Sequence, residues 1–329
     1  MREGLLGWAT EALIRHDDET GGVIARTLTA APARKQAIFA ALAVAEDKAG
    51  VIGTSDDLLP PSLGEVLRHG RSMDILRHAF GDLPVGLPGL LERIGERPLP
   101  RARDYLALRD LAASADPRGA DALRQGGRIT SRKLEVLAAL DTRWRHVNTL
   151  ERLDTTSEAL TFNAAVAFIQ SVNSKATDEA VAQAIAQMRP SSTLARLLDR
   201  LLRRADRLPP HPVPDGDNEL VPLTSVPALL QASRKYRNCL SHRLSDVAAG
   251  RMAVGEFRGE WLVEFRPLTL GAGWILRDVH GHRNGPVPLT VVADVEARCD
   301  QIGVPHIDET VGSGLWENYR RFTGELEWG

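Results

Sequence analysis

A proline-rich segment is the feature that most constrains the fold of this chain. Residues 208–218 read LPPHPVPDGDN, with prolines at positions 209, 210, 212 and 214. Proline lacks the backbone N–H that a helix or a central strand requires, and it also restricts the residue before it. The segment therefore predicts an extended connection that divides the 329 residues into a longer and a shorter part.

The part before this segment has the pattern of many short helices. Apolar residues recur at helical spacing, and proline or glycine interrupts them at intervals. No fixed repeat period stands out, so the pattern does not favour a solenoid of standard repeats. We predict an all-helical region over residues 1–207 and a proline-rich linker over residues 208–222.

Strand patterns begin only after the linker. Two strands are expected over residues 252–258 and 260–266, joined tightly at Arg258 and Gly259, and a third over residues 273–280. Helical patterns flank them over residues 228–236, 241–249 and 289–302. We therefore predict an α+β protein: a large helical N-terminal region, then a small domain (residues 223–304) with a three-stranded antiparallel meander packed by helices. Residues 305–329 are expected to form a C-terminal tail.

Strict alternation assigns the strand residues to two faces of the sheet. One face of the second strand carries Trp261, Val263 and Phe265, and the opposite face carries Leu262, Glu264 and Arg266. In the third strand, Trp274, Leu276 and Asp278 are expected to alternate against Ile275, Arg277 and Val279.

Composition limits the function classes. A net charge of −2 argues against a general polyanion binder, although a local basic patch is compatible with it. Only Cys239 and Cys299 occur, so the chain has no disulfide framework. No apolar run approaches the roughly 20 residues needed to span a bilayer. We expect a soluble, cytoplasmic protein with no membrane partner, and the Ala-, Leu- and Arg-rich usage is typical of a bacterial chain.

Spaced residues in the C-terminal part carry a family resemblance. Asn238-Cys239-Leu240, Gly250, a strand hairpin, and Gly281-His282-Arg283-Asn284 before a final helix follow one another in this order. This arrangement resembles the PcfJ-like family over residues 223–299. The family pattern has a His-Cys-Val-type triplet, an aromatic residue four positions after the cysteine, a glycine seven positions later, a β-hairpin, a Gly-x-x-Asn turn and a helix.

Four positions match this pattern and two depart from it. Cys239, Gly250, Gly281 and Asn284 agree in identity and spacing, whereas Asn238 replaces the usual histidine and Arg243 stands where tyrosine is common. The departures count against a catalytic role for the triplet. The resemblance implies a protein of conjugative plasmids, prophages or related mobile genetic elements.

Three kinds of site are compatible with these residues. The first is a nucleophilic Cys239 with His280 or His282 as the base, which would make the chain a cysteine-dependent hydrolase or transferase. The second is zinc held by Cys239, His242, His280 and His282, because the first two lie one helical turn apart and the last two share a strand face. No other cofactor is expected.

The third kind of site binds nucleic acid or a partner protein of the same mobile element. Arginine and asparagine side chains suit phosphates and base edges. The residues available for such a surface are Arg237, Arg243, Arg251, Arg283 and Asn284. We favour this reading, in which the chain is a PcfJ-like accessory protein that binds through its C-terminal domain, and we leave open whether it is also an enzyme.

Overall fold

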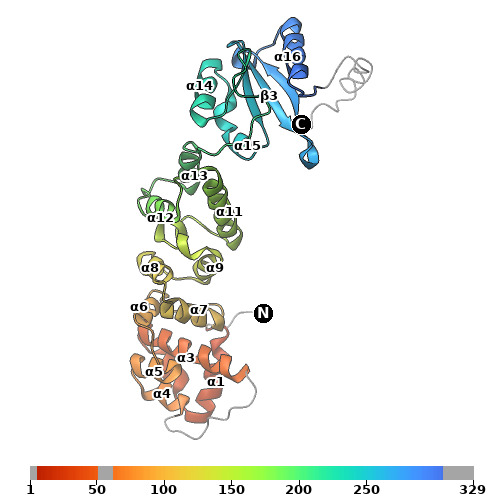
Figure 1. Ribbon diagram of the computed structural model, residues 1–329. Coiled ribbons are helices and arrows are strands. Elements are labelled where there is room, and N and C mark those ends of the chain that lie inside the picture. Colours follow the sequence, from red (N-terminus) through yellow and green to blue (C-terminus); the bar gives the residue numbers. More distant parts are fainter. Residues whose placement is uncertain (1–5, 51–61, 307–329) are drawn as a thin grey trace. The chain divides into compact units, whose positions relative to one another are not determined.

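The computed structural model describes residues 6–50 and 62–306, and these confirm the predicted α+β class with a large helical region. The chain forms two compact units (Figure 1). The N-terminal unit comprises residues up to 167 together with 177–197, and the C-terminal unit comprises residues 168–176 together with those from 198 onward. No helix in the described ranges is long and apolar enough to cross a membrane.

The described residues of the first part of the chain form helices and no strand. Their bounds are α1 Ala9–Thr20, α2 Val23–Leu28, α3 Pro32–Gly50, α4 Leu63–His69, α5 Ser72–Phe80, α6 Leu87–Glu92, α7 Ala102–Ala113, α8 Arg118–Gln125, α9 Ser131–Ala139, the 3₁₀ turn η1 Thr142–Trp144, α10 Val147–Leu150, α11 Thr156–Val172, α12 Asp178–Ala186 and α13 Leu194–Leu202. Helix α3 is the centre of the N-terminal unit, because residues 37–44 are buried on all sides and the helix contacts α5, α6 and α7. A helix that is apolar all round is stable only inside a core.

The C-terminal unit surrounds one sheet with helices. Its further elements are β1 Leu220–Pro222, α14 Val226–Tyr236, η2 Cys239–His242, α15 Leu244–Ala248, β2 Ala253–Phe257, β3 Trp261–Pro267, η3 Thr269–Gly271, β4 Trp274–His280, η4 His282–Asn284 and α16 Leu289–Gln301. Figure 1 shows α14 and α16 on opposite sides of the sheet.

The sheet has four strands rather than the predicted three, in the order β1-β2-β3-β4 and antiparallel throughout. The additional strand, β1, comes from the end of the segment that we predicted as a linker. Val213 of the same segment is 2% exposed and packs in the core of the sheet. The proline pattern concealed this because β1 is an edge strand, which tolerates the proline at its end.

A β-bulge corrects the predicted alternation of β4. Phe265 pairs with Leu276, but the preceding Glu264 pairs with Asp278, so Arg277 is an extra residue in β4. Such an insertion moves every later side chain to the opposite face. Val279 therefore joins Leu276 on the core face, and His280 faces the other way, on the same side as Glu264.

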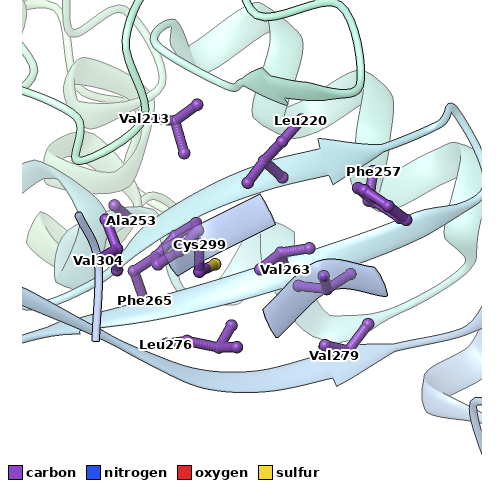
Figure 2. Packing of buried hydrophobic residues seen from close by; sticks show 11 residues of the cluster. Val213, Leu220, Ala253, Phe257, Val263, Phe265, Leu276, Val279, Cys299 and Val304 are labelled. Atoms are coloured by element: carbon purple, nitrogen blue, oxygen red, sulfur yellow. The ribbon is translucent and has the colours of Figure 1, made fainter. Parts of the chain in front are cut away.

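Helix α16 covers the core face of the sheet. Val263, Phe265 and Cys299 are fully buried there (Figure 2), and Trp261 and Trp274 pack against the same cluster. Both tryptophans thus belong to the edge of the core. Beyond α16, Leu276 N–H donates to the carbonyl of Pro305 at 2.9 Å, and residues 307–329 of the predicted tail lie outside the described residues.

Candidate functional site

The second face of the sheet carries a cavity of about 180 Å³ between the strands, η2 and η4. Four residues singled out from the sequence line it: Cys239, Arg243, His280 and Asn284. They come from three separate elements or their ends, so their meeting is a property of the fold. The other lining residues are Asn238, Leu240, Met252, Val254, Leu262 and Glu264.

A left-handed residue at the end of α14 positions the cysteine. Arg237 adopts φ 50° and ψ 48°, which terminates the helix and turns the chain toward η2. The buried Ser233 hydroxyl donates to the Asn238 carbonyl at 3.0 Å and accepts from the Ser241 N–H at 3.1 Å. The Asn238 side chain in turn accepts from the Leu240 N–H at 3.1 Å. These bonds fix the backbone around Cys239, whose side chain is exposed at the cavity.

Packing and turn geometry explain the two glycines of the family pattern without any ligand. A Cβ added at Gly281 would lie 3.1 Å from the ring of Trp261 and 3.2 Å from the Gly285 carbonyl oxygen. Gly250 follows α15 with φ 68°, a conformation that glycine adopts without strain. The other two matched residues, Cys239 and Asn284, are the ones that line the cavity.

One acidic residue that the sequence analysis did not assign to the site also lines the cavity. Glu264 accepts from Arg266 Nε at 2.7 Å, and its other oxygen lies 3.6 Å from His280 Nε2. Its side chain is 14% exposed. The sequence did place the carboxylate of Glu264 on the strand face opposite Trp261 and Val263, two residues before Arg266. It could not show that His280 lies on the same face, because that depends on the bulge in β4.

Glu264 and His280 shift each other's pKa. The ion pair with Glu264 raises the pKa of His280, against the effect of burial and with help from Asp278. Burial works to raise the pKa of Glu264, but His280 and Arg266 outweigh it and the net pKa is lowered. The ionised pair is therefore the favoured state of this wall between the lowered pKa of Glu264 and the raised pKa of His280.

We predict a pH-dependent contribution of His280 to stability. The raised pKa of His280 stabilises the fold below its ordinary value of 6.5 and loses this effect as pH rises through the folded value. The lowered pKa of Glu264 stabilises above its ordinary value of 4.5 and loses this effect on acidification. We expect His280→Gln to lower the free energy of unfolding, measured in urea, by about 1 kcal/mol relative to the parent. The loss should be largest at pH values between 4.5 and 6.5. A difference that is no larger between these two values than at alkaline pH would contradict the pairing.

Exposed arginines adjoin the cavity along the chain. Arg237 precedes Asn238, Arg251 precedes Met252 and Arg283 precedes Asn284, so each is next to a lining residue. All three are exposed, and none makes an ion pair within the described ranges. Arg243, by contrast, lines the cavity itself and holds Asp246 through its Nε at 2.7 Å.

Backbone strain gathers at the same place. In the described part of the chain, the non-glycine residues with positive φ are Arg237, Arg258, Arg283 and Asn284. Three of these adjoin or line the cavity, and the fourth forms the β2–β3 hairpin. A left-handed conformation costs an L-residue about 1–2 kcal/mol, which glycine would avoid. Strain of this kind often marks functional sites.

The remaining predicted site residues do not line the cavity. His242 and His282 are exposed and absent from its wall, although each neighbours it in the chain. Among the described residues, no group of three or more His, Cys, Asp or Glu side chains is placed to hold a metal ion. No hydrogen bond joins Cys239 to His280 in this part of the structure, although both line the same cavity.

Comparison of the chain with protein-family models, with curated proteins and with solved structures finds no match. The resemblance to the PcfJ-like family accordingly stays a prediction from the sequence.

Proposed function

We propose that this chain is a nucleic-acid-binding accessory protein, of the PcfJ-like type, that acts in the cytoplasm for a mobile genetic element. Single-stranded nucleic acid would bind across the cavity of the C-terminal unit. The observation that carries the proposal is the set of exposed arginines without ion pairs, Arg237, Arg251 and Arg283, each next to a lining residue. Arginine is suited to bidentate contacts with phosphate.

The contrast with other arginines of the same unit supports this reading. Arg258 binds Glu219 and Asp294, Arg266 binds Glu264, and Arg298 binds Asp217. Those three guanidinium groups are engaged in the fold, whereas Arg237, Arg251 and Arg283, each next to a lining residue in the chain, make no ion pair among the described residues. Two of the three also keep a strained left-handed backbone, which a side chain with no task beyond folding would not explain.

A salt series tests the proposal. We expect a labelled single-stranded oligonucleotide to bind the full chain with an affinity that falls steeply as salt rises. A plot of the logarithm of the binding constant against the logarithm of the salt concentration should fall with a slope of about 0.7 for each phosphate contact. Fluorescence anisotropy measures this directly. Arg103→Gln, at an exposed position of α7 in the N-terminal unit, is the matched control and should leave the slope unchanged. Absence of binding at low salt would overturn the proposal.

A cysteine-dependent hydrolase or transferase is the second candidate. Its specific support is that Cys239 and His280 line one cavity and that Glu264 lies beside His280, which is the order nucleophile, base and orienting acid. In such a site the histidine would take the thiol proton, the sulfur would attack an acyl carbon, and the histidine would pass the proton to the leaving group as its bond to that carbon breaks.

Thiol alkylation separates the two candidates. An activated Cys239 should react with iodoacetamide near neutral pH, and His280→Gln should slow that reaction roughly ten-fold. Cys299 is an internal control, because it is fully buried and burial, with Asp300 and Glu296, raises its pKa to about 12. A folded protein in which Cys239 reacts at the rate of an ordinary thiol, with or without His280, would exclude the enzyme reading.

A further inference from the structure

The size and walls of the cavity point to one kind of ligand group. Its volume of about 180 Å³ lies below the roughly 300–1,000 Å³ of pockets that enclose drug-sized ligands, so it suits a single small ring system. Met252, Val254 and Leu262 are buried apolar residues of its floor. A flat heterocycle would pack its face on such a floor and meet polar groups with its edge.

The edge would meet an acceptor that still has free lone pairs. Glu264 Oε1 accepts from Arg266 Nε, but Oε2 is 3.6 Å from His280 Nε2, which is longer than a hydrogen bond. A carboxylate has about four acceptor positions in all. Glu264 therefore retains acceptor capacity, and it lines the cavity at a half-buried place where an unmatched polar group is costly.

We infer that the cavity takes one unstacked nucleobase and selects bases that carry an exocyclic amine. Glu264 would accept from the amine, as carboxylates accept from the amine of cytosine. Thymine and uracil place a carbonyl oxygen at the equivalent position, where it would repel the carboxylate. The whole ring of a base can enter the cavity only when that base is unstacked and outside a duplex, so the ligand is single-stranded. This inference rests on the proposed function and adds base selectivity to it.

The amide of Asn284 is the second polar group of the cavity suited to reading a base. It offers both a donor and an acceptor, and it lines the cavity from the end of η4, where its backbone is left-handed (φ 54°). The arginines beside the cavity would hold the neighbouring phosphates without regard to sequence. Affinity and base choice are thus assigned to different residues.

Oligo(dC) and oligo(dT) of equal length form the matched pair of probes. With the full chain at neutral pH we expect oligo(dC) to bind about ten-fold more tightly, within the range that a good base-edge contact gives. Glu264→Gln should abolish that preference while leaving the salt slope of oligo(dT) binding intact. Equal binding of both oligonucleotides by the parent would overturn the base selectivity alone, and no binding of either would overturn the proposed function as well.

A second measurement avoids dependence on the fold of the variant. N-ethylmaleimide on the folded parent should modify the exposed Cys239, which lines the cavity, and spare the buried Cys299. The adduct should remove the preference for oligo(dC) and retain salt-dependent binding of oligo(dT). A modified protein that still prefers oligo(dC) ten-fold would show that the base is read elsewhere and would overturn the inference.

Discussion

Replacing both Arg237 and Arg283 by glycine is expected to weaken binding of single-stranded nucleic acid strongly while leaving the fold intact. Loss of two phosphate contacts should lower the log–log salt slope by about 1.4, at about 0.7 for each contact. Both positions have left-handed backbone, with φ of 50° and 58°. Glycine relieves about 1–2 kcal/mol of that strain at each site and costs about 0.5–1 kcal/mol in chain entropy. The free energy of unfolding should therefore stay level or rise, by up to about 3 kcal/mol over the two sites.

The hairpin arginine supplies the matched control for this variant. Arg258 has φ 49°, but its guanidinium binds Glu219 and Asp294 rather than facing the cavity. Arg258→Gly should leave the affinity and the salt slope unchanged, and it should lower the unfolding midpoint relative to the double variant because it removes two ion pairs. Salt titrations and urea unfolding of both proteins check the contrast. An unchanged slope in Arg237→Gly/Arg283→Gly would remove these two arginines from the binding surface.

The sequence predicted the C-terminal elements well because their patterns are local. The hairpin at Arg258 and Gly259, the third strand and the final helix all depend on alternation, turns and helical spacing within a few residues. Such features need no knowledge of distant parts of the chain.

Features that depend on pairing between distant segments escaped prediction. The edge strand β1 is recognisable only once β2 is there to pair with it, since three residues ending in proline have no strand pattern of their own. The bulge at Arg277 is set by the register between β3 and β4, and it decides that His280 faces Glu264. A one-residue shift therefore determines the composition of the cavity wall, and local alternation predicted the wrong face for Val279.

A buried polar network in the N-terminal unit leads to the largest stability prediction. The Tyr105 hydroxyl donates to Gln36 Oε1 at 2.7 Å and accepts from the Leu99 N–H at 3.0 Å. Gln36 also donates through Nε2 to the carbonyls of Gly95 and Arg97, both at 2.8 Å. Tyr105 is 1% exposed and Gln36 is fully buried. One phenol oxygen thus joins the connection after α6 to the central helix α3.

Tyr105→Phe removes that oxygen and keeps the aromatic ring in place. It leaves Gln36 Oε1 and the Leu99 N–H without their partner in the core. Each such buried group costs about 1–3 kcal/mol of unfolding free energy. We expect a loss of about 3 kcal/mol in unfolding free energy, measured by urea denaturation.

Tyr236→Phe in the C-terminal unit is the matched substitution. It removes a 2.7 Å bond to Glu256, but Glu256 keeps the Lys235 ammonium as a partner at 2.7 Å and is only half-buried. Its cost should therefore be smaller, at about 1 kcal/mol. Equal losses in the two variants would mean that water reaches Gln36 and Leu99 when the hydroxyl is removed. The network would then contribute no more to stability than a partly exposed hydrogen bond.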